Sequence, residues 1–273
     1  MLVFAAITPH PPIIIPGIGS PKDLKLAKNT ISAMEKLSQK ISEAKPDTVI
    51  IISPHAAVHS DRFAIYASPH FYGNFGQFNA PSISQRFDNN LFLAEKIRKK
   101  ADEAGIGAFL FGDPESDHFE LDHGEMVPMY YLGKGLPNDT KVIPIAYSYL
   151  DRAQHYAFGQ VMQEVADSPE FADERIAIIA SGDLSHRLTP DTDNGYNNAG
   201  KDFDKQLVEF ISQDKVRDII EMDEEFIEEA GECGFRSILV LLGALEACKY
   251  QPEVLSYEGP FGVGYLVANF ELK

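Results

Sequence analysis

Short apolar runs rich in β-branched residues recur along the chain and alternate with segments of helical pattern. Several runs, such as VIIIS and IAIIAS, are almost continuously apolar, as strands buried on both faces of a sheet are. The runs span residues 2–8, 47–53, 62–68, 141–148, 175–181 and 261–270. Helical patterns cover residues 21–44, 90–104, 151–166, 197–212 and 235–249. This alternation predicts an α/β fold whose mostly parallel central sheet is flanked by helices on both faces.

The chain shows neither a linker nor a low-complexity tract, so we expect a single domain over residues 1–273. A formal net charge of −17 argues against binding to nucleic acid or to an anionic membrane surface. The opening apolar run is too short to span a membrane and lacks a basic segment before it, which predicts a cytoplasmic protein. Cys233 and Cys248 are too few for a disulfide framework, and we expect reduced thiols.

Two further segments have a distinctive composition. Residues 66–90 form a long connector rich in glycine, asparagine and aromatic residues. A connector of this length in a compact domain is typical of a lid, a binding loop or a contact between subunits. The acidic stretch at residues 221–232 predicts a solvent-exposed helix face.

Three of the eight histidines follow apolar runs: His10 after LVFAAITP, His55 after TVIIISP and His186 after IAIIASGDLS. Ligands of open α/β sheets bind beyond the carboxyl ends of the strands, so three such imidazoles can converge on one site. Pro9 and Pro54 fix φ just before two of them and reduce the freedom of each turn. Any one of these histidines alone is equally typical of a hydrogen-bonded turn residue. Three in equivalent positions favour a ligand site.

Neutral imidazole binds iron, zinc, copper and nickel, and two histidines with one carboxylate form the facial triad of non-haem Fe(II) oxygenases. Glu232, in the segment EEAGECGFRS, precedes a helical run whose N-terminus would support a negative charge. Cys233 is a competing ligand because a thiolate also binds these metals. The alternatives are an ordinary surface acid for Glu232 and a buried unreactive thiol for Cys233.

Six segments, in this order, resemble the LigB superfamily, which contains the catalytic subunits of class III extradiol ring-cleaving dioxygenases and the Memo proteins. The segments are ITPHPP, ISPHAAVHSDRF, LDHGEMVPMYYL, SGDLSHRL, EAGECGFRSILVLLGAL and SYEGPFGVGYLVANF. The resemblance spans nearly the full length of the chain. The chain is particularly similar to the stand-alone form of a domain that some bacteria fuse to an AMMECR1 domain.

The resemblance implies that His10 and His55 bind a metal and that an acid in the GEC segment completes the ligand set. It implies that His186 is the catalytic acid/base and that His123 is a second active-site histidine facing the substrate. Dioxygenases of the family place a glutamate near this segment and Memo-like relatives place a cysteine before the glycine. This chain has both, as Glu232 and Cys233, so either one can be the third ligand.

The implied reaction is insertion of O2 into a catechol-type aromatic substrate at an Fe(II) site, with zinc or another divalent transition metal as the alternative ion. We expect a homodimer or a small partner subunit. The alternative functions are a Memo-like metal-binding redox or adaptor protein without ring cleavage, and a zinc-dependent hydrolase that activates water.

Four further residues are weaker candidates. An unperturbed imidazole has a pKa of about 6.5, which suits His186 to proton transfer near neutrality. Asp183 is a candidate for orienting the His186 ring, and the alternative is that Asp183 is a turn or capping residue. His59 can support the site only if residues 55–59 are helical. Arg187 and Arg236 are candidates for binding a substrate carboxylate, against the alternative of plain salt bridges.

Overall fold

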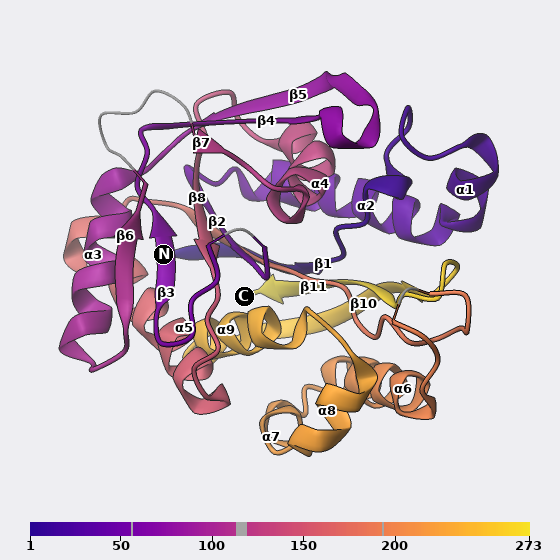
Figure 1. The fold of residues 1–273 in the computed structure, drawn as a ribbon. Coiled ribbons are helices and arrows are strands. Elements are labelled where there is room, and N and C mark those ends of the chain that lie inside the picture. Colours follow the sequence, from indigo (N-terminus) through magenta and orange to yellow (C-terminus); the bar gives the residue numbers. More distant parts are fainter. Residues whose placement is uncertain (56, 113–118, 193) are drawn as a thin grey trace.

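The computed structural model describes residues 1–55, 57–112, 119–192 and 194–273, and Figure 1 shows its ribbon. A central sheet of eight strands runs through the molecule. Its strand order is β10 (Tyr250–Glu258), β11 (Tyr265–Leu272), β1 (Leu2–Thr8), β9 (Ile176–Ser181), β2 (Thr48–Ser53), β8 (Lys141–Ala146), β3 (Phe63–Tyr66) and β6 (Ala108–Phe111).

The middle of the sheet is parallel. Parallel pairs join β1 to β9, β9 to β2 and β2 to β8, and β6 is parallel to β3. Antiparallel pairs join β3 to β8, β11 to β1 and β10 to β11. The predicted α/β fold with a mostly parallel central sheet is confirmed. No helix in the described part of the chain is long and apolar enough to cross a membrane.

Helices cover both faces of the sheet (Figure 1). One face packs against α2 (Lys28–Ala44), α4 (His123–Leu132) and the short η1 (Pro12–Ile14). Beside them, α1 (Pro21–Leu26) contacts η1 and α2, and η3 (Gly133–Gly135) contacts α2 and α4. The other face packs against α3 (Leu91–Glu103), α5 (Arg152–Ala166), α6 (Asn198–Ser212), α7 (Val216–Ile220), α8 (Glu224–Ala230), α9 (Phe235–Leu245) and η4 (Pro169–Phe171).

The alternation of side chains along β2 explains why its sequence is continuously apolar. Val49 and Ile51 belong to the core on the α2 side, whereas Ile50 and Ile52 belong to the core on the α5 side. All four are at most 1% exposed. Because neither face of the strand meets water, no polar residue alternates with the apolar ones.

Residues 66–90 differ from the predicted connector. They contain β4 (His70–Phe75), η2 (Gly76–Phe78) and β5 (Ala80–Asp88), a hairpin that forms a second sheet with β7 (Phe119–Glu120). Most side chains of β5 are exposed or only partly buried, so its sequence lacks the apolar run by which the other strands are recognised. The long connector therefore contains a hairpin that its sequence did not indicate, and the turn of this hairpin reaches the site described below.

The acidic stretch is helical as predicted. Asp223 accepts a hydrogen bond from Phe226 N and begins α8. The four glutamates of this helix are exposed, while Ile227 and Ala230 face the core.

Candidate metal centre

Two histidines lie at the edge of the sheet where the parallel strands end. His10 lies two residues beyond β1, and His55 lies two residues beyond β2. Strand β9 pairs with both of these strands, so their carboxyl ends lie on either side of it. His123, the first residue of α4, approaches from the helix layer.

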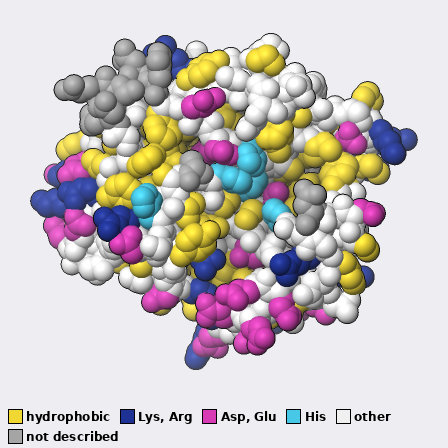
Figure 2. All heavy atoms as spheres, viewed as in Figure 1, with side chains coloured by type: hydrophobic (Ala, Val, Ile, Leu, Met, Phe, Trp, Pro, Cys, Tyr) yellow, Lys and Arg dark blue, Asp and Glu magenta, His cyan; other side chains and the backbone are white. Residues whose placement is uncertain are grey.

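These three imidazoles form a compact cluster, here called the histidine triangle: His10, His55 and His123. Each offers one ring nitrogen, and the three nitrogens all lie within 4.8 Å of one another. The Nε2 atoms of His10 and His55 are 3.2 Å apart. His10 is 2% exposed, while the other two rings are half-buried. Histidine side chains are visible near the middle of the face drawn in Figure 2.

The hydrogen bonds around His10 fix which of its nitrogens carries the proton. Its Nδ1 lies 3.0 Å from Ser181 Oγ, at the end of β9. The Ser181 hydroxyl donates its only proton to the carbonyl of Gly124, so it must accept from His10 Nδ1. His10 Nε2 therefore presents a lone pair to His55. Asp183 Oδ1 also accepts the backbone N–H of His10, at 2.9 Å, and holds the turn.

A carboxylate faces the other two rings. Asp122, the N-cap of α4, has its Oδ1 2.5 Å from His123 Nδ1 and 3.6 Å from His55 Nδ1. Burial raises the pKa of Asp122, but its contacts with the two imidazoles and with the N–H of Gly124 outweigh burial and hold the pKa below the usual range.

Burial keeps the two facing imidazoles neutral. It lowers the pKa of His55 to about 4, assisted by the charge of His123, and it holds the pKa of His10 well below its usual value, assisted by His55, His123 and His186. Neutral imidazole is a common metal ligand, and two Nε2 atoms that face each other can bind one ion. Two nitrogens bound at 2.0–2.1 Å with an angle between 90° and 110° lie roughly 2.8–3.4 Å apart, so the observed spacing of 3.2 Å fits a shared metal ion.

Cys233 lies beside His10. Its Sγ is 3.7 Å from His10 Nε2 and accepts a hydrogen bond from Asp183 N at 3.3 Å. A thiolate bound at about 2.3 Å and an imidazole at about 2.1 Å, in tetrahedral geometry, would be roughly 3.6 Å apart. Cys233 is thus at ligand spacing from His10. Burial raises the pKa of its thiol well above the ordinary value, so without a metal the sulfur is protonated.

Glu232 has a different environment from Cys233. Its Oε2 accepts a hydrogen bond from Phe235 N, the first residue of α9, at 2.5 Å. Burial raises the pKa of Glu232 to about 7, against the opposing effects of Phe235 N–H and Arg236. In this conformation the carboxylate accepts from the first N–H of α9, at the expected helix N-terminus, and the Sγ of its neighbour Cys233 lies beside His10.

His186 and Asp183 extend the site along β9. His186 lies in the turn after β9, where its backbone N–H donates to Gly231 O at 3.1 Å, and its charge contributes to lowering the pKa of His10 and His55. Its Nε2 is buried and has no hydrogen-bond partner among the described residues. Burial lowers the pKa of His186. Asp183 bonds to His10 and to the backbone of the Cys233 turn, so its described contacts hold those two segments and not the ring of His186.

The remaining predicted residues are His59, Arg187 and Arg236, and their described contacts are with residues outside the histidine triangle. His59 packs its ring on Phe109, with ring centroids 4.8 Å apart, and residues 57–59 are not helical. Arg187 donates to the carbonyl of Glu229 near the end of α8. The guanidinium of Arg236 lies 6.0 Å and 5.5 Å from the rings of Tyr147 and Tyr149.

Three residues at the site were not predicted from the sequence: Asp122, Ser181 and Phe78. Asp122 directly precedes His123 in the LDHG segment, and Ser181 ends an apolar strand, so the sequence position of both residues could have indicated them. Phe78 carried none. It sits at the turn between β4 and β5, and its ring centroid is 5.7 Å from that of His123.

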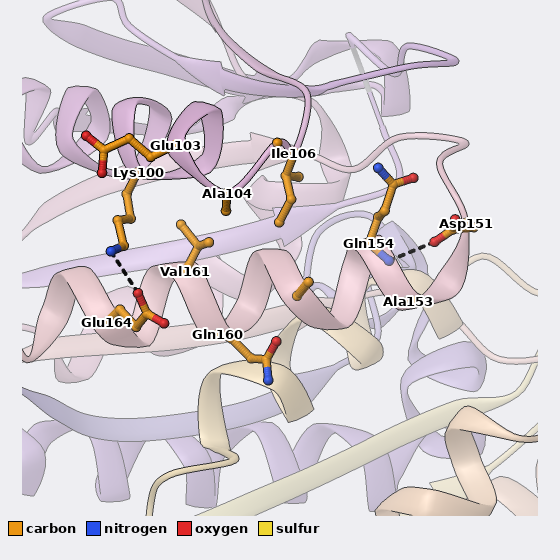
Figure 3. Close-up of a pocket in the computed structure, with 12 residues that line it drawn as sticks. Lys100, Glu103, Ala104, Ile106, Asp151, Ala153, Gln154, Gln160, Val161 and Glu164 are labelled. Atoms are coloured by element: carbon orange, nitrogen blue, oxygen red, sulfur yellow. Dashed lines mark hydrogen bonds and ion pairs between the residues drawn. The ribbon is translucent and has the colours of Figure 1, made fainter.

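Two further cavities were compared with the histidine triangle. Figure 3 shows one of about 450 Å³ between α3 and α5. Its apolar wall includes Ile106 and Val161, and its charged groups Lys100 and Glu164 pair with each other at 3.0 Å. No residue of the histidine triangle lines it. A polar cavity of about 290 Å³, lined by Asn74, Gln77, Glu120, Leu121 and Asp122, adjoins the triangle through Asp122.

Fold and site together define an α/β protein with a cluster of three histidines that could hold a metal ion near the carboxyl ends of parallel strands. The LigB family, described as the catalytic LigB subunit of aromatic ring-opening dioxygenase, matches residues 4–268. The chain therefore belongs to the LigB family.

Relatives agree with this assignment. Protein CA_C1420 of Clostridium acetobutylicum is 37% identical over 269 residues, which are 97% of this chain and 56% of that protein. The chain thus spans little more than half of that relative's length. An Escherichia coli 3,4-dihydroxyphenylacetate 2,3-dioxygenase is 25% identical over 84% of both chains. The 2-aminophenol 1,6-dioxygenase beta subunit of a Pseudomonas species is 22% identical over 99% of this chain and 94% of its own.

A solved structure shares the fold. The uncharacterized protein JW3007 of Escherichia coli K12 superposes with a TM-score of 0.66 over 98% of this chain and 99% of its own, at 15% sequence identity.

Proposed function

We propose that residues 1–273 form one LigB-like catalytic domain that opens the ring of a catechol-type aromatic substrate with O2. The observation that carries the proposal is the pair of facing Nε2 atoms of His10 and His55, 3.2 Å apart, at the strand edge of a LigB-family chain. Two relatives are named as dioxygenases of 3,4-dihydroxyphenylacetate and 2-aminophenol, which supports a substrate with adjacent oxygen or nitrogen groups on a ring.

In this proposal His10 and His55 hold the metal, which we take to be Fe(II), with zinc or another divalent transition metal as the alternative. The third ligand comes from the turn before α9. Cys233 supplies it in the conformation described, whereas Glu232 can do so only by leaving its contact with Phe235 N. When bound, the ion supplies a shared binding point for substrate and dioxygen and a path for electrons between them.

The chain's own residues then handle protons and position. His186 is neutral at pH 7 and has an unpaired buried Nε2, so it can accept a proton from a substrate hydroxyl and return it later. His123, whose Nδ1 lies 2.5 Å from Asp122 Oδ1, belongs to the same histidine triangle and is placed to face the substrate. Phe78 covers His123 and limits access of water from the β4–β5 turn.

The oxygen balance of the reaction defines the test. Both atoms of O2 enter the product, one carbon–carbon bond of the ring breaks, and a ring-opened semialdehyde acid forms from a catechol. The protein is purified anaerobically, loaded with Fe(II), and mixed with a panel of catechols and 2-aminophenol while oxygen uptake and ring-opened product are followed. We expect equal consumption of oxygen and substrate with at least one compound.

Two controls sharpen the test. His186→Gln should lower turnover but retain iron, and His70→Ala, which breaks an exposed contact with Asp88, should leave both unchanged. If an iron-loaded sample consumes no oxygen with any compound, the proposal is wrong.

A second candidate is a metal-binding protein without ring cleavage, similar to the Memo proteins. The placement of Cys233 Sγ 3.7 Å from His10 Nε2 favours it, because a thiolate ligand distinguishes that branch from the dioxygenases. Stoichiometric metal binding that depends on Cys233, together with no oxygen uptake, would support this second function. The name of the Pseudomonas relative as a beta subunit supports a partner subunit, and size-exclusion chromatography would separate that from a homodimer.

A further inference from the structure

Asp122 faces two imidazoles that come from different parts of the chain. His55 follows β2, and His123 begins α4. The same carboxylate oxygen of Asp122 lies 2.5 Å from Nδ1 of His123 and 3.6 Å from Nδ1 of His55. The first distance is that of a close ion pair, although His123 Nδ1 has no partner with hydrogen-bond geometry among the described residues. The second exceeds a hydrogen bond, yet it brings the negative charge close to that nitrogen.

A carboxylate can only accept hydrogen bonds, so the nitrogen that faces it carries the proton. A proton on Nδ1 leaves the lone pair on Nε2, and the tautomer of a ligand histidine is set by what its other nitrogen contacts. His10 obtains the same tautomer from Ser181. The three rings of the histidine triangle therefore have an oxygen on the Nδ1 side, and Asp122 provides it for two of them.

We propose that Asp122 is the positioning residue of the metal centre, fixing the Nδ1–H tautomer of His55 and His123 together and turning their Nε2 atoms inward. This inference rests on the proposed function because it assigns His55 to the metal. It also links the ligand histidine to the histidine that faces the substrate, since one carboxylate orients both.

Asp122 has a second role that the test must separate. It is the N-cap of α4, where its side chain accepts from Gly124 N at 3.4 Å. Serine and asparagine are also good N-caps, so both replacements preserve the start of the helix. Asp122→Ser is too short to reach the imidazoles. Asp122→Asn keeps the shape and an acceptor oxygen but loses the charge.

The matched control lies on the protein surface. His70 Nδ1 and Asp88 Oδ1 form the same kind of contact at 2.7 Å, on the β4–β5 hairpin and outside the triangle. Asp88→Ser removes a carboxylate from a histidine without touching the site. Its melting temperature and that of Asp122→Ser are compared with the wild type, all without metal, to verify folding.

Two measurements decide the proposal. Zn²⁺ affinity is measured by competition with a chromophoric chelator, and the histidine tautomers of metal-free protein are read by ¹⁵N NMR above pH 7. We expect Asp122→Ser to bind Zn²⁺ about 10–100-fold more weakly, Asp122→Asn to be weakened less, and Asp88→Ser to match the wild type. We also expect His55 and His123 to lose the Nδ1–H tautomer in Asp122→Ser while His10 retains it.

Wild-type affinity and unchanged tautomers in a folded Asp122→Ser variant would overturn the proposal and leave Asp122 as a helix cap. Failure of the proposed function gives a different result. In that case the wild type itself binds no Zn²⁺, and the NMR measurement still decides whether Asp122 sets the tautomers.

Discussion

His10 and His55 are 45 positions apart in the sequence, yet their Nε2 atoms lie 3.2 Å apart. Strand β9 lies between β1 and β2, and all three are parallel, so the turns that follow β1 and β2 meet above the end of β9. Ser181, the last residue of β9, then holds His10 Nδ1 and turns its Nε2 toward His55. Two neutral nitrogens at this distance repel each other unless a proton or a cation lies between them.

The first prediction follows from that pair. His10→Ala should remove metal binding, because one of the two facing nitrogens is lost. A metal that binds only the folded state raises the melting temperature, and a concentration of about 100 Kd adds about 2.7 kcal/mol. Wild-type protein should therefore melt several degrees higher with Zn²⁺ than without it, measured by differential scanning calorimetry. His10→Ala should show no shift, and an equal shift in both proteins would contradict the assignment.

The second prediction concerns the third ligand. Cys233→Ser should weaken Zn²⁺ binding at least tenfold, because Sγ stands at ligand spacing from His10. Glu232→Gln should bind Zn²⁺ almost normally but lose about 1 kcal/mol of unfolding free energy, because its contact with Phe235 N is weakened. Chelator competition and urea denaturation give the two values. The opposite pattern would identify Glu232 as the ligand, as in the dioxygenases of the family.

The central strands and two site histidines were predictable because each depends on local sequence. Strands buried on both faces have uninterrupted apolar runs, and a histidine just after such a run lies at the edge where parallel strands end. Helix α4 was not predicted. Eight of its ten residues are buried and Pro128 lies inside it, so its sequence has no polar face and no helical period.

The choice between Glu232 and Cys233 could not be made from the sequence. Neighbouring side chains point in different directions, and only the backbone of the turn before α9 decides which one faces the histidines. Asp122 was missed for a related reason. Its role depends on a distance to His55, which lies 67 positions earlier and reaches it only through the packing of α4 on β2.

The third prediction concerns proton transfer. His186→Gln should lower kcat for ring opening by about 10² to 10⁴, the usual contribution of a general acid or base. Metal content should remain that of the wild type, because His186 is not among the donors of the histidine triangle. Steady-state kinetics and metal analysis of the same sample separate the two effects. A variant that retains full kcat would show that another group moves the proton.

The fourth prediction concerns acid stability and His155, which is fully buried in α5. Its ring nitrogens contact the carbonyls of Asp151 and Ser148, at 2.9 Å and 3.1 Å. Burial lowers the pKa of His155 to about 4, assisted by the charge of Arg236 and opposed by the two carbonyls. The unfolded chain, with a pKa of about 6.5, therefore takes up this proton first as the pH falls.

Because the unfolded state binds more protons between pH 6.5 and 4, the stability contributed by neutral His155 is complete above pH 6.5 and is lost as the pH falls toward 4. The difference in unfolding free energy between metal-free wild type and His155→Asn should be constant above pH 7. It should then change by about 3 kcal/mol in favour of the variant on going to pH 4, at about 1.4 kcal/mol per pKa unit. Urea denaturation at steps of pH measures this difference, and a constant difference over the whole range would show that the ring is protonated or hydrated in the folded protein.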